Sequence, residues 1–170
     1  LLPQAYSKQL IAFALGACAS VAICLTDYRR LARWSLVIYG FSIFLLVIVL
    51  IPGIGTTRFG AQRWIDIGSF SFQPSEFAKL ASLLLIANYL SRPVEELREP
   101  LVFLRLIAFM ALPFVLILKE PDLGSALALI PIGLAMVFIA GTPMKYLKRL
   151  IGGGGILVAL LVIDVIVVPP

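Results

Sequence analysis

The sequence predicts an all-α fold, a polytopic bundle of transmembrane helices with about six spans in these 170 residues. Hydrophobic residues make up 61% of the chain and charged residues only 14%, whereas a soluble domain carries about 25% charged residues. Several apolar runs also approach the ~20 residues that a helix needs to cross a hydrocarbon core of ~30 Å. We therefore expect one membrane domain over residues 1–170, part of a longer protein, with spans at about 8–26, 34–51, 74–90, 101–118, 123–140 and 151–168.

The first three expected spans each have a local signal. Small residues such as Gly16 and Ser20 suit close helix packing in the first span. The Pro52-Gly53 pair ends the second span. Pro74 fits the first position of the third helix, because an N–H group there would have no helical partner. The polar stretch 56–73 between the second and third spans is expected to be a loop.

The last three expected spans are marked by proline and glycine. Pro113 predicts a kink in the fourth span, and Pro131 interrupts the fifth. Four glycines at 152–155 open the sixth span and lack the Lys-Ser/Thr of a phosphate-binding loop, so they predict close packing or a flexible start. The chain contains no His, which excludes a His-based metal site or general base in these residues.

The distribution of Lys and Arg predicts the orientation. Most of these residues lie in the loops on one side of the membrane, the side of Arg29, Arg92 and Lys145, which the positive-inside rule makes cytoplasmic. The loop 56–73 and the turn 119–122 then share the outer side. Because orientation explains the net charge of +5, no nucleic-acid partner is predicted.

Glu76 and Lys79 lie three residues apart at the start of the third span. On a helix they share one face and can pair. A structural interpretation is equally supported: Glu76 suits the helix dipole, and the pair makes a Lys tolerable at membrane depth. In the functional interpretation, the pair lines an outward-facing cavity for a charged headgroup.

Arg63 belongs to the segment Arg63-Trp64-Ile65-Asp66 of the outer loop. A guanidinium suits phosphate binding because its donors form a planar fork. From these four residues alone, an exposed Arg63–Asp66 ion pair is the favoured interpretation. Trp64 has the character of an interfacial anchor.

Asp122 precedes the fifth span, where Asp is a favoured N-cap. Together with Lys119 and Glu120 it forms a second polar cluster on the outer side. The helix start there attracts anions, but the two local carboxylates oppose that effect.

Three motifs in order resemble the SEDS family (shape, elongation, division and sporulation proteins), and its RodA-like branch in particular. They are GAQRWIDIG, FQPSEFAK and EPDLGSA, with KQL before and DYRRL after the first span in the same pattern. The resemblance implies a multi-pass protein of the bacterial inner membrane with about ten spans, of which this chain represents the second to seventh.

The resemblance also implies an activity. Such proteins are peptidoglycan glycosyltransferases that polymerise lipid II in cell elongation and cell-shape maintenance, among membrane lipids and with a class B penicillin-binding protein. The family's catalytic Asp is expected after Pro170, so no catalytic residue is expected in this chain, and the chain alone is expected to be inactive. No cofactor is expected here, the metal remains undetermined, and a divalent cation is an option for the full-length enzyme.

The residues that match the family's polar positions are candidates for the substrate cavity: Arg63, Glu76, Lys79 and Asp122. By the resemblance, Arg63 and Lys79 would stabilise the departing pyrophosphate, Glu76 would position Lys79, and Asp122 would shape the cavity. Glu120 and Ser125 stand where related sequences often have Gln and Thr.

Two other classes of function stay open at this point. One is a flippase or transporter of the lipid-linked precursor, because prolines within spans and intramembrane charges are also typical of alternating-access proteins. The other is a non-catalytic membrane scaffold of the cell-wall machinery.

Overall fold

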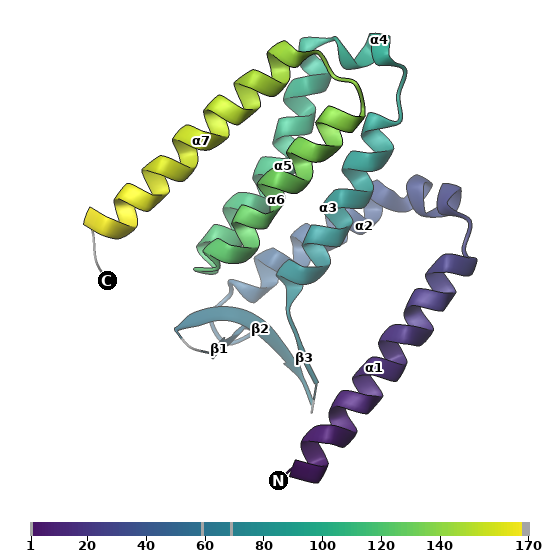
Figure 1. The fold of residues 1–170 in the computed structure, drawn as a ribbon. Coiled ribbons are helices and arrows are strands. Elements are labelled where there is room, and N and C mark those ends of the chain that lie inside the picture. The colour runs from purple at the N-terminus through teal and green to yellow at the C-terminus, as the bar shows by residue number, and fades with distance from the viewer. Residues whose placement is uncertain (1, 59, 69, 168–170) are drawn as a thin grey trace. The chain divides into compact units, whose positions relative to one another are not determined.

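The computed structural model describes residues 2–58, 60–68 and 70–167 (Figure 1). The predicted helical class is confirmed, since most of the described chain is helix. The elements are α1 Leu2–Leu25, α2 Tyr28–Val49, β1 Thr56–Arg58, β2 Ala61–Ile67, β3 Phe70–Phe72, α3 Pro74–Leu90, α4 Val94–Leu97, α5 Pro100–Lys119, α6 Leu123–Ile139 and α7 Met144–Val167. Residues 1–34 and 35–170 form two compact units. The site described below lies entirely in the second unit.

Each expected span falls on one long helix. By length and composition, α2 and α5 are apolar and long enough to cross a membrane, and the segments Gln9–Leu25 and Leu123–Ile139 are shorter apolar helices. Helix α7 begins at Met144, earlier than expected, because the basic stretch before the glycines continues the helix. Which helices span the bilayer stays a prediction.

The stretch expected to be a loop folds instead into a three-stranded antiparallel sheet of order β1-β2-β3. Gly60 and Gly68 lie between consecutive strands with φ of 81° and 62°, which glycine adopts readily. The expectation of a loop was wrong because glycine and charged residues concealed the short strands. The sheet therefore places alternate side chains of β2 on opposite faces.

Gln62 fixes the sheet to the end of α2. Its Nε2 donates to the carbonyl oxygens of Val49 at 2.9 Å and Ile51 at 3.0 Å. A side chain at Gly55 would collide with the Val49 carbonyl and with Gln62. This close approach ties β2 to the last turn of α2, so the sheet is held at that end of the bundle.

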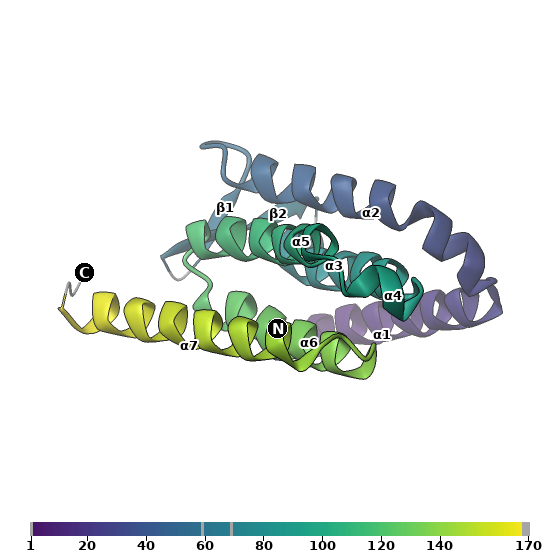
Figure 2. The same cartoon turned by 90° about the horizontal axis from the view of Figure 1, so that it is seen from above.

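Helices α3, α5 and α6 pack against one another, and α7 contacts α6. Figure 2 shows this arrangement from above. Helix α2 joins the bundle by two side-chain hydrogen bonds, Tyr39 Oη to Phe109 O at 2.9 Å and Asn88 Nδ2 to Ser35 Oγ at 3.0 Å. Near the sheet, the core contains Leu46, Ala78, Phe114, Ile117, Ala126 and Leu129.

Candidate functional site

Asp122 joins three parts of the chain at the sheet end of the bundle. It is the N-cap of α6, as predicted: its Oδ1 accepts from the Ser125 N–H at 3.0 Å. Its Oδ2 lies 3.3 Å from Arg63 Nη1 of β2 and accepts from Gln73 Nε2 at 3.2 Å. Strand β2 and the turn between α5 and α6 therefore meet, as expected for two segments on the same side of the bundle.

Asp122 is ionised in this setting. Burial is the largest single effect and raises the pKa of the carboxyl. The Ser125 hydrogen bonds and the Arg63 guanidinium outweigh it, so the pKa of Asp122 lies below its ordinary value. A helix N-terminus further favours the anion. Asp122 therefore holds Arg63 as a counter-ion at neutral pH.

The expected Arg63–Asp66 pair is wrong. Residues three apart on a strand face opposite sides of the sheet, so Arg63 turns to Asp122 while Asp66 turns away. Asp66 Oδ1 accepts from Arg58 Nη2 at 2.9 Å and from Ser71 Oγ at 2.7 Å. The Ser71 hydrogen bond has the largest effect and lowers the pKa of Asp66; with Thr56 and Arg58 it outweighs desolvation, which raises the pKa.

Glu76 and Lys79 form the predicted pair. Lys79 Nζ donates to Glu76 Oε1 at 2.8 Å, with the Lys side chain 20% exposed and the Glu side chain 60% exposed. The more buried cation is thus held by a carboxylate that is open to solvent. This contact confirms the pairing, while its role in function stays a prediction.

The candidates form two separate pairs. Among the described residues, no hydrogen bond or ion pair joins Glu76–Lys79 to Arg63–Asp122. Gln73 connects them indirectly, because its side chain reaches Asp122 and its carbonyl accepts from the Glu76 N–H at 3.2 Å. The sequence marks Gln73 as one of the polar residues of this stretch, but its contact with Asp122 was not predicted.

Glu120 is the least expected member of this polar cluster. The residue is fully buried, with 0% of its surface exposed. In the described part of the chain, neither carboxylate oxygen has a hydrogen-bond partner. Burial, followed by the charge of Asp122, raises the pKa of Glu120 to about 8, and Arg63 opposes this shift. Near neutral pH the carboxyl is mostly protonated.

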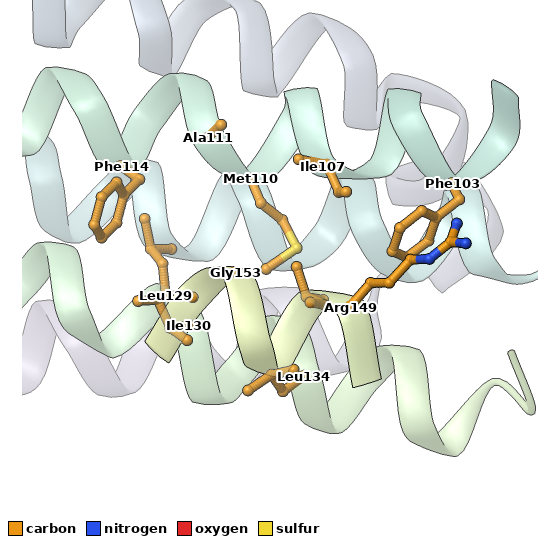
Figure 3. A pocket seen from close by; sticks show the side chains of 12 residues that line it. Phe103, Ile107, Met110, Ala111, Phe114, Leu129, Ile130, Leu134, Arg149 and Gly153 are labelled. Atoms are coloured by element: carbon orange, nitrogen blue, oxygen red, sulfur yellow. The ribbon is translucent and has the colours of Figure 1, made fainter. Parts of the chain in front are cut away.

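A pocket of about 280 Å³ lies elsewhere, between α5, α6 and α7 (Figure 3). Apolar side chains such as Ile107, Met110 and Leu134 line it, with Arg149 as the charged residue of the lining. None of the four candidate residues is part of this lining. Within the described ranges, no group of three or more His, Cys, Asp or Glu is placed to hold a metal ion.

Comparison with known proteins places the chain beside proteins of cell-wall synthesis. The model of a family described as "Cell cycle protein", which names FtsW, RodA and SpoVE, matches residues 4–169. A Pasteurella multocida protein, "Probable peptidoglycan glycosyltransferase FtsW", is 36% identical over 164 residues, which are 95% of this chain and 41% of that protein. This chain therefore spans less than half the length of that curated relative.

Solved structures agree with this similarity. The crystal structure of the Thermus thermophilus rod shape determining protein RodA matches with a TM-score of 0.75 and 32% identity, over 91% of this chain and 49% of that one. A chain from a peptidoglycan synthase complex, described as coordinating polymerization and crosslinking, matches with a TM-score of 0.73 and 31% identity, over 92% and 44%.

Proposed function

The chain belongs to the FtsW/RodA/SpoVE family of cell cycle proteins, and we propose that the full-length protein is a peptidoglycan glycosyltransferase that polymerises lipid II. The family match over residues 4–169 is the observation that carries this proposal. The reaction would take place at the outer face of the bacterial inner membrane, which the protein would cross several times. In this proposal, the carboxylate that activates the acceptor hydroxyl belongs to a part of the full-length protein outside residues 1–170.

The two ion pairs supply the electrostatic part of the mechanism. When the glycosidic bond forms, an undecaprenyl pyrophosphate leaves, and its developing negative charge needs fixed positive groups. Arg63 and Lys79 are cations held in place by Asp122 and Glu76. Lys has three N–H donors and Arg five, so each cation keeps donors for a phosphate while its carboxylate fixes its position.

Purified full-length protein incubated with lipid II, without any other glycosyltransferase, tests this activity. We expect glycan polymer on a gel, which would also contradict a transport-only function. Lys79→Ala should slow polymerisation strongly, whereas Lys145→Ala at the opposite end of the bundle should not. Failure of the wild-type protein to form polymer would refute the activity, and a normal rate for Lys79→Ala would refute the role of Lys79.

We place the protein in cell elongation and shape maintenance. The GAQRW motif and the structural match to a rod shape determining RodA support this branch, although a named FtsW is also similar. The full-length gene should restore rod shape in a strain depleted of its elongation polymerase. Rescue of division in a strain depleted of its division polymerase instead would overturn the choice of branch.

A class B penicillin-binding protein is the proposed partner, by analogy with the similar chain of the synthase complex. The two proteins should co-purify from membranes after mild detergent extraction, with an unrelated penicillin-binding protein as the negative control. A divalent cation is proposed to assist the pyrophosphate. Chelation should then lower the polymerisation rate, and added Mg²⁺ or Mn²⁺ should restore it.

A further inference from the structure

Glu120 follows α5 directly as its C-cap, and its side chain is buried away from solvent. Its N–H donates to Ile117 O at 3.0 Å, and the N–H of Asp122 donates to the same carbonyl at 3.4 Å. The turn is thus held at two points, and the side chain is wholly enclosed. An isolated carboxylate is strongly unfavourable in such a place.

Arg63 is the complementary group in the same cluster. Its Nη1 faces Asp122, but its Nε is buried and has no partner among the described residues. Its charge acts on the Glu120 carboxyl. The cluster therefore contains an unused N–H donor and an unused carboxyl acceptor, which become complementary when Glu120 loses its proton.

The charges that face Glu120 come from two elements. Arg63 on β2 favours the carboxylate, while Asp122 at the start of α6 disfavours it. Together with burial, these charges set the pKa at about 8. The other charged groups on the packed elements are Glu76 and Lys79 on α3, which bind each other, Asp66 on β2, which binds Arg58, and the exposed Arg105 and Lys119 on α5.

We propose that Glu120 is a positioning residue that competes with Asp122 for the Arg63 guanidinium, so that its protonation sets how Arg63 is held. With Glu120 neutral, Arg63 and Asp122 balance each other, and the outer N–H groups of Arg63 are free for an anionic group. When Glu120 releases its proton to solvent, its carboxylate engages Nε and the cluster gains one negative charge. An approaching phosphate is then repelled.

Infrared spectroscopy of the full-length protein in lipid nanodiscs tests the protonation directly. The carbonyl band of a protonated carboxylic acid should be lost as the pH rises through about 8. Glu120→Gln should show no such loss. Glu95→Gln is the matched control because Glu95 is exposed on α4, at the other end of the bundle. This control should retain the band and its midpoint.

Variants of the two neighbours test the competition, because they predict shifts of opposite sign. Arg63→Met removes the favourable charge and should raise the midpoint, whereas Asp122→Asn removes the unfavourable charge and should lower it, each by about one pH unit or more. The same midpoint in both variants, or no band that depends on Glu120, overturns the proposal. If Arg63→Met does not fold, an unshifted midpoint in Asp122→Asn is sufficient to overturn it.

The effect on catalysis rests on the proposed function and is measured separately. In the wild type and in Glu95→Gln, the polymerisation rate should be lower above pH 8 than near neutral pH. In Glu120→Gln the two rates should be equal. A wild-type protein without polymerase activity would refute the proposed function and leave the spectroscopic result intact. A Glu120-dependent band with an unchanged alkaline loss of rate in Glu120→Gln would refute the link to Arg63 in catalysis.

Discussion

Replacement of Asp122 by Ala and by Asn separates the two tasks of this carboxylate. Ala removes the N-cap of α6, the ion pair with Arg63 and the bond from Gln73. Asn keeps the cap, because Asn and Asp are equally good N-caps, but its NH2 group replaces Oδ2, so it loses both the ion pair with Arg63 and the acceptor for Gln73. The difference between the two variants therefore measures the cap, and the effect of Asn measures the ion pair together with the Gln73 hydrogen bond.

The structure sets the size of each contribution. Loss of an N-cap costs about 1 kcal/mol, and loss of the Gln73 hydrogen bond costs about 1 kcal/mol. The side chains of Arg63 and Asp122 are 26% and 9% exposed, so their pair lies between the about 0–1 kcal/mol of exposed pairs and the about 3–5 kcal/mol of buried ones. With about 1–2 kcal/mol for the pair, Ala should destabilise the protein by about 3–4 kcal/mol and Asn by about 2–3 kcal/mol.

The assay is unfolding of the full-length protein in mixed micelles, followed by the loss of helical circular dichroism as the denaturing detergent is increased. A double-mutant cycle with Arg63→Met isolates the pair, since Asn should cost only the Gln73 hydrogen bond once Arg63 is absent. Equal destabilisation by Asn and Ala would refute the cap argument. A cycle with no coupling energy would show that the 3.3 Å contact contributes nothing to stability.

Three further predictions concern the stability of the bundle and the sheet. Gly133→Ala forces the flexible end of the Met110 side chain to move, so it should be less favourable than Gly155→Ala by about 1 kcal/mol. Gly155→Ala in α7 meets no atom within 4 Å and should stabilise slightly; equal effects would contradict this packing. Gln62→Leu should loosen the sheet by removing the hydrogen bonds that tie β2 to the carbonyls of Val49 and Ile51. Amide exchange in β2 should become faster, and unchanged exchange would contradict this. The pKa of Glu120 is raised from 4.5 to about 8, so between these pH values the folded state binds one proton more than the unfolded state. The free energy of unfolding should therefore fall by a few kcal/mol as the pH rises from 4.5 to about 8. Glu120→Gln should abolish this dependence on pH, and a dependence that persists would refute the raised pKa of Glu120.

Local patterns in the sequence were sufficient for the helices and for contacts within a few residues. The apolar run after Pro74 matches α3, which spans Pro74–Leu90, because hydrophobic length and a proline at the first turn act on neighbouring residues. The Glu76–Lys79 pair follows from helical spacing alone. The cap at Asp122 likewise depends only on its own side chain and the next turn.

The partners of Arg63 and the state of Glu120 depended on tertiary structure. Within its own segment, Arg63 has Asp66 as the nearest acid, but a strand directs them to opposite faces, and only the meeting of β2 with the α5–α6 turn brings it to Asp122. The sequence shows Glu120 as one charge in a polar turn. Its burial between packed elements, which determines that it is mostly protonated near neutral pH, is a property of the folded arrangement, because desolvation is produced by neighbours that are distant in the chain.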